Sequence, residues 1–260
     1  MKQTKIIMGT PITIEVVGAG VPQSVFDEVF AYFEYIDTTF STYKNDSEIT
    51  KLNQGKVKME NLSDDMRLVL KLSEETKQLT NGYFDIMTLD GTCDPSGLVK
   101  GWSNYNAAKI LRKYNIKNFY IETGGDIQVS GHNGKGEQWS IGIQNPFSTK
   151  KEIVKTIYLN KNGVATSGNY VRGQHIYDPI HKSHHINDVV SITVIGPDVF
   201  EADRYATAAF AMNKEGINFI EKLPNFEGYS IDKNGLATMT SGFNNYLDKT
   251  YAQNKNTRLV

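Results

Sequence analysis

The sequence predicts an α+β protein with mixed or antiparallel sheets, and three observations carry this prediction. Helical and strand-like segments come in groups, without the strict alternation that builds a doubly wound parallel sheet. At 260 residues, with 39% hydrophobic and 22% charged side chains, the chain has the composition of a globular protein. No internal repeat, low-complexity tract or linker divides it, so we expect residues 1–260 to form a single domain.

The N-terminal segment predicts one strand followed by one helix. Residues 8–17 alternate apolar and polar side chains, as a half-buried strand does, and the glycine-rich stretch at 18–20 ends that strand. Ser24 is the expected cap of the helix, with Asp27 three residues later. Its apolar residues recur at helical spacing: Phe26, Val29, Phe30, Phe33 and Ile36.

Two further helices and two short strands are expected before residue 132. One helix begins after Ser63, ends at Asn81-Gly82 and buries Met66, Val69, Leu70 and Leu72. The next is expected from about Lys100 to Lys113. Residues 120–131 then predict two strands, because Gly124-Gly125 interrupts an otherwise strand-like run.

The C-terminal half predicts several strands, two helices and a closing hairpin. Asp198 and Glu201 have the spacing of a capping box, and they precede a helix rich in small residues that spans 199–212. A shorter helix is expected at 216–223, and a hairpin turn at 232–235. The expected strands are 139–143, 157–159, 164–166 and 189–195.

Charge and cysteine content exclude several classes of function. With 28 Lys plus Arg and 29 Asp plus Glu, the net charge of -1 provides no general field for nucleic acid or an anionic membrane. The single cysteine, Cys93, excludes an internal disulfide and any thiolate cluster. No secretory segment, membrane anchor or run of about 20 apolar residues is recognised, so we expect a cytoplasmic protein.

The common nucleotide and hydrolase motifs are missing from the sequence. It contains no GxxxxGK[ST] loop, no GxGxxG after a strand, no HExxH, no GxSxG and no paired CxxC. A nucleotide that binds this chain therefore does so without those motifs.

Asp203 and Thr207 are a candidate pair of ligands for a hard cation. They lie four residues apart on a predicted helix, so their oxygens project from one face about one turn apart. Magnesium prefers oxygen ligands and usually takes one or two protein carboxylates beside substrate phosphates. The alternative is an exposed aspartate and a threonine hydroxyl bonded back to its own helix.

Other short stretches carry residue types that bind phosphate, stack on a flat ring or transfer a proton. Gly124-Gly125 and residues 166–168 allow backbone amides to approach a ligand, although turns use the same residues. Lys100 is either a phosphate contact or a solvated lysine. Tyr83 with Phe84 suits ring stacking or a core position. His175 is a candidate base near neutral pH, although Asp178-Pro179, three residues later, is equally typical of the start of a turn.

Taken together in chain order, these stretches resemble the FAD:protein FMN transferase (ApbE) family. The resemblance runs from Met8 to about Met212. The matching stretches are Met8-Gly9-Thr10, Phe40 to Tyr43, Ser47-Glu48, Leu52-Asn53, Gly82 to Asp85, Gly97 with Lys100-Gly101, Gly124-Gly125-Asp126, Trp139 with Asn145-Pro146, Thr166-Ser167-Gly168, His175 with Asp178-Pro179, and Ala202-Asp203 with Ala206-Thr207.

The resemblance implies an ApbE-like two-lobed unit with an FAD site between the lobes. It assigns Mg²⁺, with Mn²⁺ as a possible substitute, to Asp203, Thr207 and the Val99 carbonyl. It places His175 beside the phosphoryl centre, so that His175 and Asp203 are the expected catalytic residues. The implied FAD-binding residues are Met8, Ser41, Tyr43, Tyr83, Asp85, Lys100, Thr123, Asp126 and Ser167.

The activity implied by the resemblance is transfer of FMN from FAD to a Thr or Ser hydroxyl of a protein with an FMN-binding domain. The phosphoester forms while AMP leaves, with magnesium neutralising the pyrophosphate. The alternatives are an FAD pyrophosphatase that uses water as acceptor, and a non-catalytic flavin-binding protein. Two stretches depart from the family pattern, Asp94-Pro95-Ser96-Gly97 and Ile180-His181-Lys182-Ser183, and the second indicates a different acceptor contact.

Overall fold

The computed structural model describes residues 1–150, 152–169, 176–181 and 188–247. The strands are β1 (Lys2–Ile7), β2 (Thr10–Val16), β3 (Phe119–Thr123), β4 (Asp126–Ser130), β5 (Trp139–Gln144), β6 (Ile153–Leu159), β7 (Gly163–Gly168), β8 (Val189–Gly196), β9 (Glu227–Asp232) and β10 (Ala237–Met239). Within the described residues, eight strands form one sheet in the order β1-β2-β3-β4-β7-β8-β9-β10, and β5 pairs with β6 in a second sheet. Neighbouring strands run antiparallel, which confirms the predicted α+β class with antiparallel sheets.

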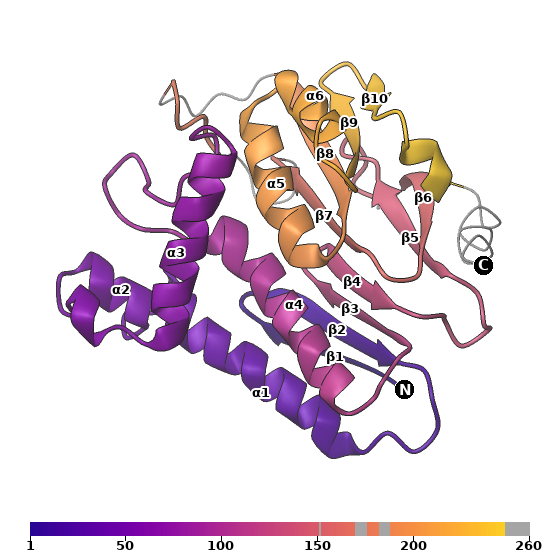
Figure 1. Cartoon of the computed structure of the whole chain (residues 1–260), viewed down its shortest axis with the longest axis horizontal. Helices are drawn as coiled ribbons and strands as arrows, with labels where there is room; N and C mark the ends of the chain where they lie inside the picture. The colour runs from indigo at the N-terminus through magenta and orange to yellow at the C-terminus, as the bar shows by residue number, and fades with distance from the viewer. Residues whose placement is uncertain (151, 170–175, 182–187, 248–260) are drawn as a thin grey trace.

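Helices cover one face of the large sheet and the small sheet covers part of the other. The helices are α1 (Gln23–Phe40), α2 (Glu48–Asn53), α3 (Asp64–Leu79), α4 (Ser96–Lys113), α5 (Val199–Ala211) and α6 (Glu215–Glu221), with short 3-10 turns η1 (Met59–Asn61) and η2 (Phe243–Tyr246). Helices α1, α4 and α5 lie across the large sheet (Figure 1). The β5–β6 sheet packs behind it through a separate apolar cluster that includes Trp139, Ile141 and Ile157. None of the described helices is both long and apolar enough to cross a bilayer.

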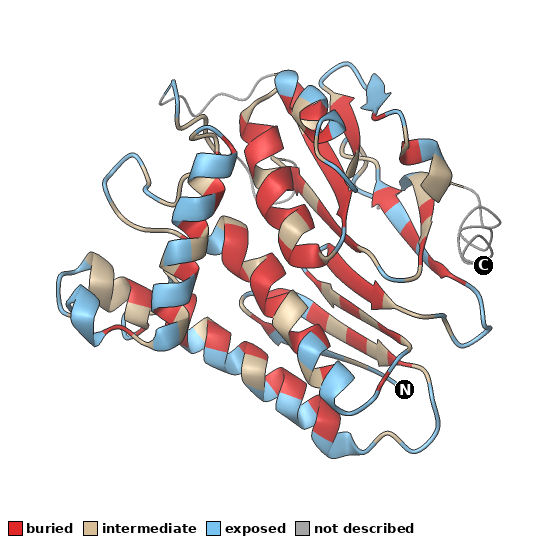
Figure 2. Ribbon diagram, viewed as in Figure 1, coloured by how far each residue is buried: buried red, intermediate tan, exposed pale blue. Residues whose placement is uncertain are grey.

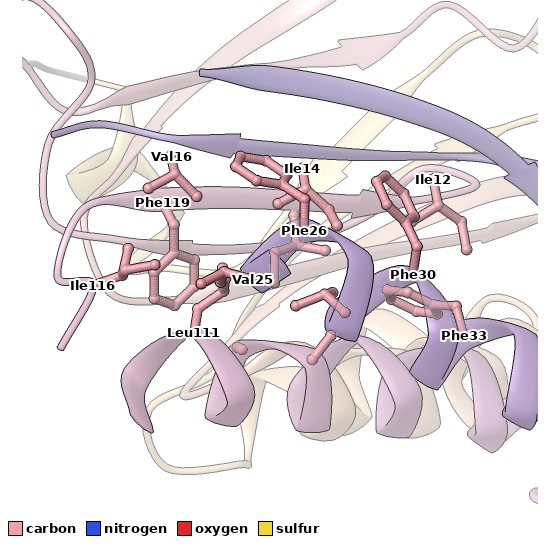
Figure 3. Packing of buried hydrophobic residues seen from close by; sticks show 14 of the residues in the cluster. Ile12, Ile14, Val16, Val25, Phe26, Phe30, Phe33, Leu111, Ile116 and Phe119 are labelled. Atoms are coloured by element: carbon pink, nitrogen blue, oxygen red, sulfur yellow. The ribbon is translucent and has the colours of Figure 1, made fainter. Parts of the chain in front are cut away.

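The N-terminal half of the core forms between β2 and α1. Ile12, Ile14 and Val16 alternate along β2 and point to the same side of the sheet. Phe26, Phe30 and Phe33 recur at helical spacing on α1 and meet that face, as Figure 3 shows. Buried residues therefore lie between the helices and the sheet (Figure 2). Each fully buried phenylalanine stabilises the fold by about 1.5–3 kcal/mol.

The prediction of the opening strand placed its start too early and did not include β1, the strand that pairs with it. Met8 and Gly9 form the two-residue turn of the β1–β2 hairpin, with φ angles of 55° and 67°, as a type I′ turn requires. The strand that was expected from residue 8 therefore begins at Thr10. Strand β1 escaped prediction because it is an edge strand whose side chains are largely exposed, so its sequence carries no apolar alternation.

The helix caps were predicted with mixed success. The Ser24 cap was wrong, because α1 begins at Gln23 after Pro22 and Ser24 lies within the first turn. The start of α3 after Ser63 and the cap by Asp198 are confirmed, since the side chains of Ser63 and Asp198 accept hydrogen bonds from the backbone N–H groups of Met66 and Glu201. Helix α4 begins at Ser96, one turn before the expected start at Lys100.

Helices α4 and α5 pack closely because two glycines of α4 face α5. A Cβ atom on Gly101 would lie 2.5 Å from the Asp203 Cβ and 2.8 Å from the Val199 carbonyl oxygen. A Cβ on Gly97 would lie 3.1 Å from the Thr207 Cγ2. The four-residue spacing of the glycines therefore matches the four-residue spacing of Asp203 and Thr207 across the helix pair.

We expect Gly101→Ala to lower the free energy of unfolding by about 1 kcal/mol or more. The added methyl group would lie 2.5 Å from a Cβ and 2.8 Å from a backbone oxygen, which places its cost in the upper part of the range for overpacking, about 2–3 kcal/mol. The gain of about 1 kcal/mol in helix propensity then leaves a net loss of about 1–2 kcal/mol. Urea denaturation measures the change. Gly134→Ala is the control, because its Cβ would have no atom within 4 Å, and equal stability of the two variants would contradict this account of the helix contact.

Candidate functional site

A cleft of about 440 Å³ lies where the first turns of α4 meet the middle of α5, the β3–β4 turn, β5 and the end of β7. Segments far apart in the sequence form its walls. Its lining residues are Thr10, Pro11, Tyr83, Asp85, Thr88, Asp94, Ser96, Gly97, Lys100, Glu122, Gly124, Gly125, Ile127, Gly142, Ile143, Gln144, Thr166, Ser167, Gly168, Ile176, Tyr177, Pro179, Asp203 and Thr207.

Lys100 and Asp203 line the floor of this cleft, and a second acidic side chain, Asp126, lies buried beside them. Asp126 and Asp203 are 1% and 3% exposed, and their carboxyl groups hydrogen-bond each other. Lys100 Nζ lies 2.8 Å from Asp126 Oδ2, and Asp203 Oδ2 accepts a 2.8 Å hydrogen bond from the Gly101 backbone N–H. We call Lys100, Asp126 and Asp203 the acidic cluster.

The acidic cluster holds more negative than positive charge when both carboxyls are ionised. Burial, followed by the neighbouring Asp126 carboxylate, raises the pKa of Asp203 to about 8, while Lys100 and the Gly101 N–H act in the opposite direction. At neutral pH the pair of carboxyls therefore retains a proton unless a cation takes its place.

Oxygen atoms of three kinds gather at the contact between α4 and α5. The Thr207 hydroxyl lies one turn after Asp203 and donates a 3.2 Å hydrogen bond to the Gly97 carbonyl of α4. Val99 is 5% exposed in the first turn of α4. The alternative of an exposed aspartate beside a threonine bonded to its own helix is therefore wrong, because Asp203 is buried and Thr207 bonds to the neighbouring helix.

The β3–β4 turn places Asp126 and opens space beside it. Gly124 and Gly125 have φ angles of 58° and 97° and connect the paired residues Thr123 and Asp126. A Cβ on Gly124 would lie 2.7 Å from the Thr10 Oγ1, whereas a Cβ on Gly125 would meet no atom within 4 Å. The turn is therefore packed on one side and open to the cleft on the other.

The end of β7 and the segment after α3 complete the described walls. The Thr166 N–H donates to Asp126 Oδ1 at 3.4 Å, and the next residue, Ser167, lines the cleft. Tyr83 and Asp85 line it from the opposite side, with Lys77 Nζ 2.8 Å from Asp85 Oδ2. Phe84 is 2% exposed and belongs to the core, so the alternative of a core position holds for that residue.

Among the predicted site residues that the structure describes, six line the cleft, and the others lie beside it or away from it. The six are Tyr83, Asp85, Lys100, Ser167, Asp203 and Thr207. Asp126 and Thr123 are buried beneath the turn, and Val99 lies in α4. Met8 packs between two apolar clusters, the Ser41 carbonyl accepts from the Ser47 hydroxyl, and Tyr43 is 96% exposed. For all the predicted site residues, whether they line the cleft or not, a contact with FAD or a cation stays a prediction.

The predicted base, His175, lies outside the described residues. The neighbouring segment 176–181 lines the cleft through Ile176, Tyr177 and Pro179. Tyr177 O–H donates to the Met87 carbonyl. Asp178 accepts from the N–H groups of Ile180 and His181, so Asp178 starts a turn as the sequence alternative suggested.

Several cleft residues were not assigned to the site from the sequence. Thr88 lies in a loop where it bonds with Asp90 and Thr92, and this loop carried no recognised motif. Gly142 lies at an exposed position of β5, between Ile141 and Ile143, and a glycine inside a strand often marks a close approach. That glycine was the available signal, although its nearest neighbour is the Ile153 side chain.

Comparison with known proteins agrees with this architecture. The ApbE family model matches residues 8–92 and 90–230. An FAD:protein FMN transferase of Haemophilus influenzae is 25% identical over 92% of this chain and 91% of its own. One from Vibrio cholerae is 26% identical over 80% of each chain.

Two solved structures share the fold. The ApbE protein of Thermotoga maritima superposes with a TM-score of 0.84 at 20% identity, covering 95% of this chain and 99% of its own. The flavin transferase ApbE of Vibrio cholerae superposes with a TM-score of 0.82 at 24% identity, with the same coverage. Because the family model covers most of the sequence and these structures share its fold, the chain belongs to the ApbE family.

Proposed function

We propose that this protein is a magnesium-dependent FAD:protein FMN transferase, which attaches FMN through a phosphoester bond to a Thr or Ser of an acceptor protein and releases AMP. The observation that carries this proposal is the acidic cluster, which lies at the floor of a cleft of about 440 Å³. Relatives that align along most of the chain bear the name FAD:protein FMN transferase, which supports the same reaction.

The residues present fit a hard divalent cation. Two buried carboxyls hydrogen-bond each other, and the raised pKa of Asp203 indicates that a positive charge would be favourable there. In the described part of the chain no group of three His, Cys, Asp or Glu side chains forms a metal cluster. The small number of acidic side chains suits a magnesium site with few protein ligands, because Mg²⁺ keeps waters and substrate phosphate oxygens in its shell.

We assign the cation to Asp203, Thr207 and the Val99 carbonyl. When bound, the cation supplies charge neutralisation for the pyrophosphate of FAD. Mn²⁺ accepts the same oxygen ligands. Lys100, held by Asp126 at 2.8 Å, adds a second positive charge at the cleft floor, where a phosphate oxygen would meet it.

The transfer step requires the acceptor hydroxyl to reach the phosphorus of the FMN half. Its oxygen forms a new bond to that phosphorus, the bond from the phosphorus to the bridging pyrophosphate oxygen breaks, and AMP leaves with that oxygen. The hydroxyl proton passes to a base, for which His175 is our candidate by sequence. Open space beside Gly125 provides room for the substrate at the β3–β4 turn.

Release of AMP with and without an acceptor tests the proposed function. The purified protein is incubated with FAD and Mg²⁺, in the presence or absence of an FMN-binding domain, and AMP and the intact mass of the acceptor are followed. We expect the acceptor to gain one FMN as AMP appears. Asp203→Ala should slow both by on the order of 100-fold or more, because it removes a carboxylate from the charged site.

Other outcomes of this experiment identify the competing activities. AMP that appears equally fast without acceptor, with no mass gain when one is present, would identify an FAD pyrophosphatase. FAD binding without any AMP would identify a flavin-binding protein. Either result would contradict the transferase.

Cation affinity should fall as the pH is lowered. The pKa of Asp203 is raised, so below about pH 8 its carboxyl holds a proton that the cation must displace. We expect the apparent affinity for Mg²⁺ to drop by up to about tenfold per pH unit below that value and to level off above it. Calorimetric titration at about pH 6.5 and about pH 8.5 measures this. Equal affinities at the two values would count against Asp203 as the titrating ligand.

Lys100→Met should weaken FAD binding. Removal of an ammonium group that meets a phosphate costs about 1.5–3 kcal/mol, so we expect KM for FAD to rise about tenfold or more. Lys44→Met is the matched control, because Lys44 forms a 2.7 Å ion pair with Asp37 outside the cleft lining. Equal KM values for FAD in the two variants would show that Lys100 does not contact the phosphates.

A further inference from the structure

Asn104 lies one helical turn after Lys100 on α4 and is fully buried. Its Nδ2 group donates to two backbone carbonyls on adjacent strands. The distances are 3.0 Å to the Asp126 oxygen and 3.4 Å to the Ile121 oxygen. This side chain therefore ties α4 to both strands of the β3–β4 hairpin.

Helix α4 thus holds Asp126 at two points. Asn104 binds the main-chain carbonyl of Asp126, and Lys100 binds its carboxylate at 2.8 Å. The same carboxylate accepts from the Thr166 N–H and meets Asp203. A shift of the Asp126 main chain would therefore move the carboxylate that connects Lys100 to Asp203.

The surroundings of Asn104 do not otherwise require a polar side chain. Ala107, Ala108 and Ile121 are fully buried in the same helix–sheet contact. Asn104 Oδ1 has no hydrogen-bond partner among the residues that the structure describes, and neither does Thr123 Oγ1 on the facing strand. An unpartnered buried oxygen costs free energy, so packing does not account for an amide here, whereas its two donated bonds do.

We propose that Asn104 is a positioning residue, which holds the Asp126 carboxylate against Lys100 and Asp203 and so sets the cation affinity of the acidic cluster. The amide acts through Asp126 and does not touch the substrate. This inference rests on the proposed function, because the cation is part of that function. It concerns the geometry of the cluster, however, so the cation affinity can be measured without FAD.

The variants Asn104→Ala and Asn104→Leu test the proposal, the second retaining most of the side-chain volume. Mg²⁺ and Mn²⁺ affinities are measured by calorimetry without FAD, well below the melting temperature of each variant. We expect both variants to lose affinity by about tenfold or more. Ser103→Ala is the control, because Ser103 is also fully buried on α4 but donates within the helix, to the Lys100 carbonyl at 2.8 Å, and should keep the original affinity.

A double variant shows whether Asn104 acts through Asp126. If it does, Asn104→Ala combined with Asp126→Asn should bind the cation no more weakly than Asp126→Asn alone. Additive losses, or wild-type affinity in Asn104→Ala with a lowered melting temperature, would show a purely structural role and overturn the proposal. Cation binding that depends on Asn104 without any AMP release from FAD would uphold the positioning role while contradicting the transferase.

Discussion

The close packing of α4 against α5 is the constraint on which the rest of the site depends. Gly101 lets the Asp203 side chain approach the backbone of α4 until Asp203 Oδ2 accepts from the Gly101 N–H at 2.8 Å. One turn away, Gly97 gives Thr207 the same access. Side chains larger than hydrogen at these positions would push the helices apart. The oxygen atoms of Asp203 and Thr207 can therefore lie against the first turns of α4 only with glycine there.

This packing creates an electrostatic requirement that the fold alone does not satisfy. It removes Asp203 from water and places it beside Asp126, while Lys100 supplies one positive charge for two carboxyls. Burial of an unmatched charge is costly, and the pair responds by retaining a proton. A divalent cation would relieve the same cost without a proton, so the unmatched negative charge that destabilises the cluster is also the feature that favours a cation.

The sequence predicted local features well and long-range contacts poorly. Periodic apolar residues identified α1 and α3, and the two glycines between Thr123 and Asp126 marked the turn that the structure contains. Spacing also paired Asp203 with Thr207, but it could not show that Asp203 is buried or that it meets Asp126, since those depend on how distant elements pack. Strand β1 and the cap of α1 were missed because an exposed edge strand and a proline-led helix start carry little periodic signal.

The stability of the surrounding core explains how the chain tolerates such a site. The aromatic residues Phe26, Phe30 and Phe33 are fully buried beside α4, and a second apolar cluster packs around Leu98 and Trp102 on α4 itself. Each such side chain stabilises the fold by about 1.5–3 kcal/mol, so a few of them offset the cost of the acidic cluster. A ligand at 100 times its dissociation constant adds only about 2.7 kcal/mol. The cluster is therefore held in place chiefly by the core, and the proposed cation would add little to the stability of the chain.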